Sequence, residues 1–250
     1  MIEVEEIKEN HSDTAPSRVM VWKLFDRISH RYDLLNRLLS FYQDVRWRKK
    51  VVDHLKNSPA QTVLDIATGT GDLLITLCSN SGNIRNGIGI DMARKMMEIG
   101  RKKTKKMKLN NKTSLLPGDA EHIPFRNNTF DAVTIAFGIR NLLDVNSGLV
   151  EMMRVLKPGG RSIILEFSLP ENSLMKKMYL FYFRYILPKA GALISGDSYA
   201  YNYLNRTVET FPYGEKFNPL MKEAGFINLK SKPLTFGVAT IYTGDKPDLN

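Results

Sequence analysis

The sequence has little of what stabilises secreted or membrane-spanning proteins. Cys78 is the single cysteine among 250 residues, so a disulfide framework within the chain is excluded and a thiol packed in the core is expected. No uncharged apolar run reaches the length of about 18 residues that a membrane-spanning helix needs. Residues 1–10 are acidic and lack an apolar stretch, so no signal peptide is expected. These absences predict a cytoplasmic protein.

Metal-binding and charge signals are also weak. The sequence has four histidines, which do not cluster, and no metal site is predicted from them. Lys and Arg number 36 against 26 Asp and Glu, which gives a net charge of +10. This excess is compatible with solvated helix faces, with nucleic acid or with anionic lipid headgroups. Composition alone leaves these three interpretations open.

Helical and strand patterns alternate along most of the chain. Apolar residues at helical spacing over residues 21–52 predict two or three helices ahead of the first strand. The alternation that follows is typical of a parallel α/β sheet with right-handed crossovers. Strands are expected at residues 62–67, 86–91, 113–117, 130–137 and 161–167, and helices at 72–79, 93–104, 145–156 and 213–224.

The end of the chain predicts a closing strand pair. Residues 157–160, Lys-Pro-Gly-Gly, are expected to end a helix and turn into the fifth strand. Two last strands, at 226–230 and 237–243, are expected to pair like a hairpin, with the last strand antiparallel. We therefore expect a loose leader at 1–17 and a single domain at 18–250. Its parts are N-terminal helices (18–58), a cofactor-binding core (59–172), a helical insertion (173–212) and a C-terminal helix with strands (213–250).

The most informative segment is residues 63–73, VLDIATGTGDL, which predicts a buried strand that turns through glycines into a helix. Such a loop lies at the carboxyl end of a sheet, where doubly wound folds bind ligands. A dinucleotide fingerprint needs a third glycine, but Leu74 holds that position. A phosphate loop needs Gly-Lys-Ser/Thr, but Asp72 follows Gly71 and would repel a phosphate. The loop therefore favours a nucleoside ligand without phosphate.

Two further strand ends carry aspartates. Asp91 ends the strand Ile88-Gly89-Ile90, and an acid at this position commonly binds both ribose hydroxyls. Asp119 follows the third strand and can accept from an adenine amino group, while Ala120 offers a backbone N–H to the ring. Together with the glycine loop, these positions predict S-adenosylmethionine (SAM) as the cofactor.

The longer motifs make the resemblance specific. The chain resembles the class I SAM-dependent methyltransferases, and within them the quinone-biosynthesis C-methyltransferases that act on demethylmenaquinone and 2-methoxy-polyprenyl-benzoquinol. The resemblance covers residues 21–244 and implies a Rossmann-like seven-stranded α/β sheet. It rests on VLDIATGTGD, GIGID, LLPGDAEHIPF, FDAVTIAFGIRN, EMMRVLKPGGRSIILEFS, the entry segment FDRISHRYDLLNRLLSFYQDVRWRK and the late GDSYAYNYLNRTVETFP.

The resemblance implies roles for individual residues toward SAM. Asp65 is expected to order the glycine loop or to reach the SAM amino group through water. Gly69, Thr70 and Gly71 are expected to contact the methionine moiety. The remaining contacts are expected from Asp91 and Met92 to the ribose, from Asp119 and Ala120 to the adenine, and from the backbone of Ala136, where a serine is frequent in this family.

Candidate catalytic residues follow the fourth strand and lie in the entry segment. Arg140 is too basic to act as the base itself, but it can stabilise a phenolate or hold a water that takes the proton. Asn141 can hydrogen-bond a ring oxygen. Tyr32, with Asp33 and Asn36, is expected to close over the cofactor and touch the ring or the methionine moiety; the competing interpretation is an exposed helix residue.

The insertion at 173–206 is too long for a simple crossover, and residues 174–187 are apolar and aromatic all round. This pattern fits either a buried helix or an interfacial segment. Since the resemblance implies a prenylated quinol, we expect a flap that binds the isoprenoid tail and touches the inner face of the membrane.

The expected reaction is C-methylation of demethylmenaquinol to menaquinol. The alternatives are methylation of the benzoquinol of ubiquinone biosynthesis, or of both quinols. An RNA methyltransferase and a non-catalytic scaffold are disfavoured, so no nucleic-acid partner is expected. A homo-oligomer stays open.

Overall fold

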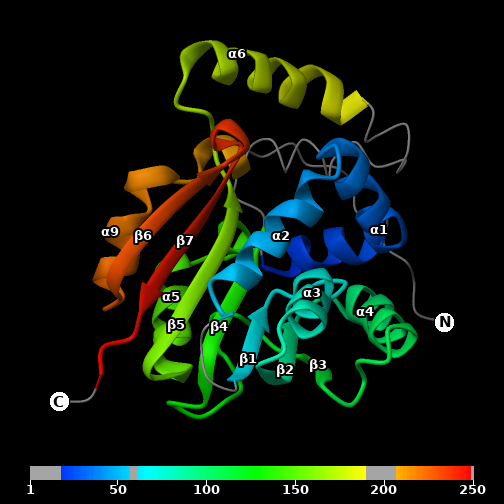
Figure 1. Cartoon of the computed structure of the whole chain (residues 1–250). Helices are drawn as coiled ribbons and strands as arrows, with labels where there is room; N and C mark the ends of the chain where they lie inside the picture. Colours follow the sequence, from blue (N-terminus) through cyan, green and yellow to red (C-terminus); the bar gives the residue numbers. More distant parts are fainter. Residues whose placement is uncertain (1–17, 57–60, 190–206, 249–250) are drawn as a thin grey trace.

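A seven-stranded sheet forms the centre of the protein (Figure 1). The computed structural model describes residues 18–56, 61–189 and 207–248, so the predicted leader 1–17 and residues 190–206 of the insertion lie outside the described residues. The strand order is β3-β2-β1-β4-β5-β7-β6. The strands are β1 (Gln61–Ile66), β2 (Ile84–Asp91), β3 (Thr113–Pro117), β4 (Phe130–Ala136), β5 (Leu156–Phe167), β6 (Ile227–Leu234) and β7 (Ala239–Asp245).

The strand directions agree with the predicted topology. β1 to β5 pair in parallel, and β7 runs antiparallel to both β5 and β6. The order reverses beside β1, whose two neighbours are β2 and β4. A ligand crevice is expected outside the carboxyl ends of the strands at this reversal.

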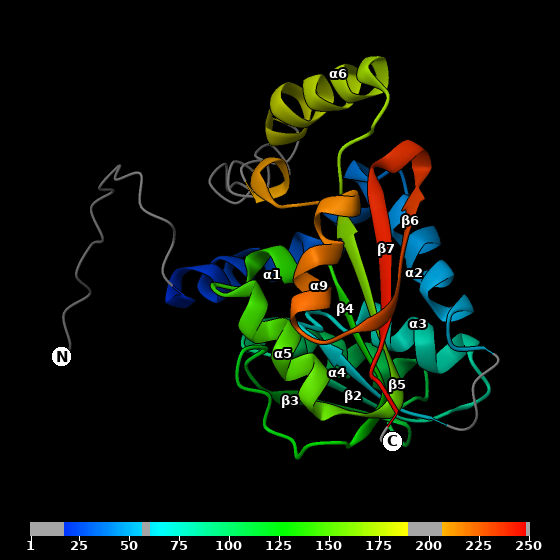
Figure 2. The same ribbon diagram turned by 90° about the vertical axis from the view of Figure 1, so that its left-hand side faces the viewer.

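Helices cover both faces of the sheet, as Figure 2 shows with α5 and α9 on one side and α2 and α3 on the other. Apolar side chains of α2 and α3 pack on one face, and those of α5 and α9 on the other. Cys78 is buried in α3, within the first of these cores. The helices are α1 (Arg18–Leu39), α2 (Gln43–Asp53), α3 (Asp72–Asn80), α4 (Arg94–Lys106), α5 (Val145–Val155), α6 (Ser173–Phe181) and α9 (Asn218–Glu223).

Several predicted boundaries are wrong. β6 continues to Leu234 instead of ending at 230. Two other differences have a clear cause in the structure. β5 begins at Leu156 rather than 161, because Gly159 donates to Lys246 and Lys246 donates to Gly160, so the backbone of the predicted turn joins the sheet. The helix predicted at 213–224 is split into a short turn, η3 (Gly214–Lys216), and α9. Pro219 lies in the first turn of α9, where its missing N–H costs nothing, and therefore begins a new helix.

Two elements lie above the carboxyl ends of the strands (Figures 1 and 2). They are α1 and the helix formed by α6 with its continuation η2 (Tyr182–Ile186). A third apolar cluster joins them: Leu24 and Leu35 of α1 pack with Phe183 of η2 and with Leu187. Within the described residues, no helix is long and apolar enough to cross a membrane.

Candidate active site

The glycine loop leaves β1 in a left-handed conformation. Gly69 and Gly71 have φ of 56° and 77°, and Ala67 has φ of 47°. Asp65, 1% exposed in β1, accepts hydrogen bonds from Thr68 (2.6 Å) and Thr134 (2.8 Å). Burial raises the pKa of this carboxyl to about 6, although both hydroxyls oppose the shift. Asp65 is not among the lining residues of either cavity described below, and its bond to Thr68 joins β1 to the loop.

A cavity of about 110 Å³ opens beside this loop, and we call it the glycine-loop cavity. It lies at the carboxyl ends of β1, β2, β3 and β4, and most of the predicted cofactor contacts come together there. Its lining includes Gly69, Asp91, Met92, Asp119, Ala120, Ala136 and Asn141, together with Tyr32 of α1.

Asp91 and Asp119, two of the three acids that line this cavity, are held by backbone amides. Asp91 accepts from the N–H of Gly69 and from the N–H of Ala93, both at 2.7 Å. Burial raises the pKa of Asp91 to about 6. Asp119 accepts from the N–H of Glu121 at 3.0 Å. Both carboxylates are thereby fixed in orientation on the wall of the cavity.

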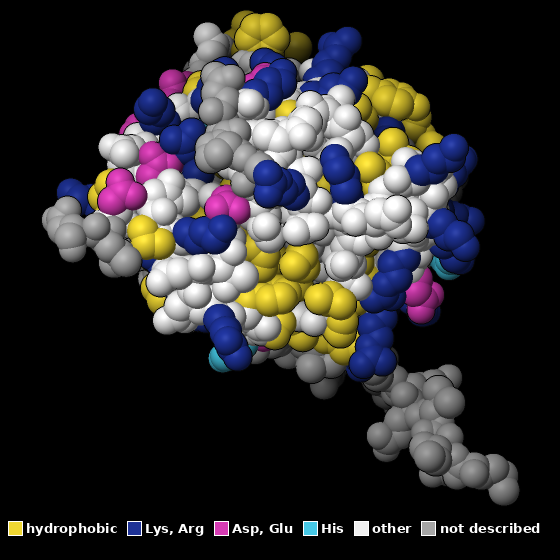
Figure 3. Space-filling view, turned by 60° about the horizontal axis from the view of Figure 1, so that its bottom comes forward, with side chains coloured by type: hydrophobic (Ala, Val, Ile, Leu, Met, Phe, Trp, Pro, Cys, Tyr) yellow, Lys and Arg dark blue, Asp and Glu magenta, His cyan; other side chains and the backbone are white. Residues whose placement is uncertain are grey.

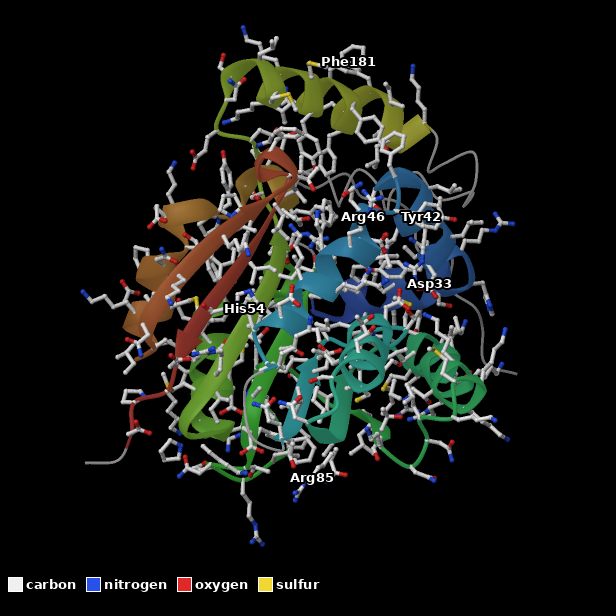
Figure 4. The ribbon with its side chains drawn as sticks, in the orientation of Figure 1. Asp33, Tyr42, Arg46, His54, Arg85 and Phe181 are labelled. Atoms are coloured by element: carbon white, nitrogen blue, oxygen red, sulfur yellow. The ribbon has the colours of Figure 1, made fainter. Side chains whose placement is uncertain are left out.

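Thr70 and Gly71 do not line this cavity. The hydroxyl of Thr70 donates to Asp33 of α1 at 2.6 Å and accepts from Lys103 of α4 at 3.0 Å. Asp33 lies where α1 faces α3 and α4 (Figure 4) and also pairs with Lys103. Thr70 therefore joins the loop to α1 rather than facing the ligand space.

These contacts continue as a chain of charges that we call the ionic ladder: Asp33, Lys103, Asp72, Arg37, Asp44 and Arg48. Lys103 pairs with Asp72 at 2.5 Å, and Arg37 joins Asp72 (2.7 Å) to Asp44 (2.6 Å). Arg48 pairs with Asp44 at 2.5 Å. Although burial opposes it, the positive charges of Arg48, Lys103 and Arg37 lower the pKa of Asp72 to about 2. The ladder joins α1 and α2 to the glycine loop.

A second cavity, of about 200 Å³, lies between α1, α2 and η2, and we call it the aromatic cavity. Most of its wall is apolar. Phe25, Tyr32 and Phe137 line both cavities, so the two spaces adjoin. The aromatic residues of the wall are Phe25, Tyr32, Phe41, Trp47, Phe137, Phe167, Tyr179, Tyr182 and Phe183.

Arg140 and Asn141 lie at this junction, one on each side. Arg140 lines the aromatic cavity, and its side chain is 4% exposed and pairs with the fully buried Glu166 at 2.5 Å. Burial raises the pKa of Glu166, and the charge of Arg140 opposes that rise. The Arg140 Nε and the Asn141 Oδ1 are buried atoms that have no hydrogen-bond partner among the described residues. Both orphaned atoms are suited to a polar ligand.

Tyr32 is half-buried rather than exposed, and its ring packs edge-on against Phe25 at 5.9 Å. Burial raises the pKa of its phenol. The competing interpretation of Tyr32 as an exposed helix residue is therefore wrong.

Sequence reasoning missed Glu166, Asp44 and Arg48. The acid of Glu166 lies inside an apolar strand, and a lone acid in such a strand signals a buried partner. Asp44 and Arg48 are spaced i, i+4 on α2, which indicates a pair but not its burial. In the described part of the chain, no group of three or more His, Cys, Asp or Glu residues could hold a metal ion.

Comparison with known proteins agrees with this geometry. A sequence model of the ubiE/COQ5 methyltransferase family matches residues 9–246. The ubiquinone/menaquinone biosynthesis C-methyltransferase UbiE of Geotalea daltonii is 44% identical over 226 residues, which are 90% of this chain and 96% of that protein. The demethylmenaquinone methyltransferase of Bacteroides fragilis is 41% identical over 242 residues, covering 97% and 98%.

Solved structures share the fold at lower identity. A SAM-dependent methyltransferase of Thermotoga maritima, described as a possible histamine N-methyltransferase, matches with a TM-score of 0.64 at 21% identity, over 90% of this chain and 99% of that one. Phosphoethanolamine N-methyltransferase 2 of Haemonchus contortus, solved with SAM, matches with a TM-score of 0.64 at 16% identity, over 91% and 60%. The sheet is thus that of the class I SAM methyltransferases. From the family match and the identity of its relatives, this chain belongs to the ubiE/COQ5 family of SAM-dependent methyltransferases.

Proposed function

We propose that this protein transfers a methyl group from SAM to a ring carbon of demethylmenaquinol, which yields menaquinol. The observation that carries the proposal is the pair of adjoining cavities. One presents fixed carboxylates beside a glycine loop, and the other is aromatic and large enough to take a flat ring. The names of the relatives, demethylmenaquinone methyltransferase among them, support the same acceptor.

The glycine-loop cavity fits SAM. Gly69 brings bare backbone to its wall, where an added Cβ would meet Met96 at 3.5 Å. Asp91 would hold the ribose hydroxyls, with Met92 beside them, and Asp119 and Ala120 would hold the adenine. Ala136 and Asn141 line the rest of the wall, and the buried Oδ1 of Asn141 would gain a partner from a polar group of the ligand. When bound there, SAM supplies an electrophilic methyl group.

The residues at the junction act on the acceptor. Loss of a phenolic proton makes the adjacent ring carbon nucleophilic, so a cation that stabilises the phenolate lowers the barrier. Arg140 provides that charge from a buried position, and Glu166 holds its guanidinium in place. Asn141 and Tyr32 orient the ring between the two cavities, and the aromatic walls exclude water.

The helix formed by α6 and η2 provides evidence for a substrate that is bound in the membrane. Its inner side chains Tyr179, Phe183 and Leu187 line the aromatic cavity, while an outer stripe is exposed to solvent. Phe181 lies on that outer side (Figure 4). A helix that is apolar on both sides needs a second apolar phase outside it. The exposed fractions of the stripe are 66% for Leu174, 60% for Met178, 60% for Phe181 and 58% for Tyr185.

Two turns extend this apolar surface around the mouth of the aromatic cavity. Phe41 and Tyr42, between α1 and α2, are 73% and 57% exposed, and Phe236, between β6 and β7, is 77% exposed. All three have positive φ (51°, 59° and 58°), a strained conformation for bulky residues that is typical of functional sites. We propose that α6 and these turns rest on the inner face of the membrane, so that the isoprenoid tail enters the cavity directly from the lipid.

The test is an assay of the purified full-length protein with methyl-labelled SAM and two reduced acceptors, demethylmenaquinol and the benzoquinol precursor of ubiquinone. The proposal predicts label in menaquinol. Label only in the benzoquinol product, or in neither product, would contradict it.

A further inference from the structure

Arg140 is matched by a second buried guanidinium in the aromatic cavity. Arg48 lines the same cavity from α2, and its side chain is 7% exposed. Arg140 enters from the end of β4, so the two cations come from different elements. Resting on the proposed function, we infer that Arg48 binds the second oxygen of the quinol, across the ring from the hydroxyl that Arg140 contacts.

The partners of Arg48 leave hydrogen-bond donors available. Guanidinium carries five N–H donors in a rigid fork. Arg48 gives Nη1 to Asp44, which accepts from Arg37 and Ser40 as well. Asp44 therefore holds Arg48 by one edge. Within the described residues no further hydrogen bond of this guanidinium is seen, so its other donors can bind a ligand oxygen in the cavity.

Two aromatic rings that touch each other each contact one of the two guanidinium groups, so both cations lie beside the same part of the cavity. The Arg48 Cζ lies 5.4 Å from the ring centroid of Phe137, and the Arg140 Cζ lies 5.3 Å from that of Phe167. These two rings touch each other, with centroids 4.5 Å apart. The charges of both arginines also act on the phenol of Tyr32, where each opposes the rise in pKa that burial causes. Both guanidinium groups therefore lie close to the junction of the two cavities.

Two separate cations match the two oxygens of the acceptor. A 1,4-quinol has two oxygens on opposite sides of a flat ring. The oxygen beside the acceptor carbon needs a cation that stabilises negative charge, whereas the opposite oxygen only needs a donor that fixes the ring. A site built to bind an oxygen rejects an analogue that lacks it, because the buried donor is then left unpaired. Arg48 is thus a specificity-determining residue for a 1,4-dioxygenated ring.

The experiment compares two acceptors that carry the same short prenyl chain. One is the 2-prenyl-1,4-naphthoquinol, kept reduced with dithionite. The other is 3-prenyl-1-naphthol, which keeps the hydroxyl beside the acceptor carbon and lacks the opposite one. The readout is the ratio of kcat/KM for the quinol to kcat/KM for the naphthol. The intrinsic reactivity of each acceptor is the same for every variant, so a change in this ratio reports on binding of the second oxygen.

Arg48→Met is expected to lower the ratio at least about tenfold relative to the unmutated protein, as for one lost hydrogen bond to a charged donor. KM for the quinol should rise, while KM for the naphthol stays unchanged. Two variants serve as controls. Arg37→Met removes the other cation that pairs with Asp44, and Arg37 lines neither cavity. Arg46→Met changes an exposed position on α2, the helix that carries Arg48 (Figure 4). Both control variants should keep the ratio of the unmutated protein.

An unchanged ratio in Arg48→Met would overturn the inference. An equal fall of the ratio in Arg37→Met would overturn it as well. Either result would mean that Arg48 acts only as a structural part of the ionic ladder and does not bind the second oxygen. Arg48→Gln is measured in parallel, so that a folding defect in one variant does not remove the test. If the unmutated protein methylates neither acceptor, the proposed function itself is overturned.

Discussion

At the scale of single residues, we expect Asp91 to make the binding of SAM depend on pH. Its two oxygens accept from the backbone of Gly69 and Ala93, and burial raises its pKa to about 6. The ribose hydroxyls need the ionised carboxylate as acceptor, so protonation competes with SAM. As the pH falls from 7 to 5 through this pKa, the ionised fraction decreases about tenfold.

We therefore expect the Kd for SAM to rise about tenfold between pH 7 and pH 5 in calorimetric titrations. Asp91→Ala should lose most SAM affinity, and Asp91→Asn should weaken binding and flatten its pH dependence. The same Kd at both pH values in the unmutated protein would remove the ribose role of Asp91.

Arg140 is expected to act on turnover and not on cofactor binding, because it lines the aromatic cavity alone. Arg140→Ala should leave the Kd for SAM unchanged and lower kcat at least about tenfold, which is roughly 1.4 kcal/mol in the barrier. The variant also leaves Glu166 buried without its cation, which costs about 3–5 kcal/mol of stability.

The double variant Arg140→Met with Glu166→Gln separates these two effects. It should recover much of the thermal stability without recovering turnover. If either variant has the same kcat as the unmutated protein, the catalytic role of Arg140 is ruled out.

At the scale of elements, the ionic ladder joins the helices that wall the aromatic cavity to the glycine loop. Arg37 is its centre, since it bridges Asp44 of α2 and Asp72 of α3. Arg37→Met should lower the free energy of unfolding by about 2 kcal/mol in urea titrations, the usual loss for hydrogen bonds between charged groups. The exposed Lys50→Met on α2 is the control and should change it little. Equal stability of the two variants would argue against the ladder as a structural link.

The outer stripe of α6 is the element expected to bind lipid. Met178→Glu with Phe181→Glu should weaken binding to vesicles of phosphatidylglycerol and phosphatidylethanolamine at least about tenfold, because two apolar side chains lose their burial in the membrane. The matched control is Val150→Glu, an apolar position on α5 that is 52% exposed. Equal co-sedimentation of the two proteins, or no sedimentation of the unmutated one, would contradict the membrane contact.

The elements also show what the sequence could predict. Glycine spacing and apolar runs located β1, β2 and their loop, because these signals are local. The sequence could not show that Gly69 lines the cavity while Thr70 of the same loop binds α1, since the partner of Thr70 is Asp33, 37 positions away. The extension of β5 depends on Lys246 at the far end of the chain. Contacts between distant segments leave no periodic signal in either partner.

At the scale of the whole molecule, Lys and Arg side chains are spread over the surface shown in Figure 3 among few acidic ones. On this face, the basic side chains do not form the single stripe that is typical of a nucleic-acid groove. The exposed apolar side chains of α6, among them Leu174, Met178 and Phe181, lie on the side of the molecule above the strand ends. We propose that lipid, acceptor and cofactor lie in one line through the membrane contact, the aromatic cavity and the glycine-loop cavity.

The most direct measurement of this arrangement is a crystal structure of the full-length protein with S-adenosylhomocysteine and a short-chain analogue of the quinol. The account predicts the adenosyl group between Asp91 and Asp119, and the ring against Arg140 with its prenyl chain directed toward α6. Density for the nucleoside outside the glycine-loop cavity, or for the ring on any other surface, would contradict it.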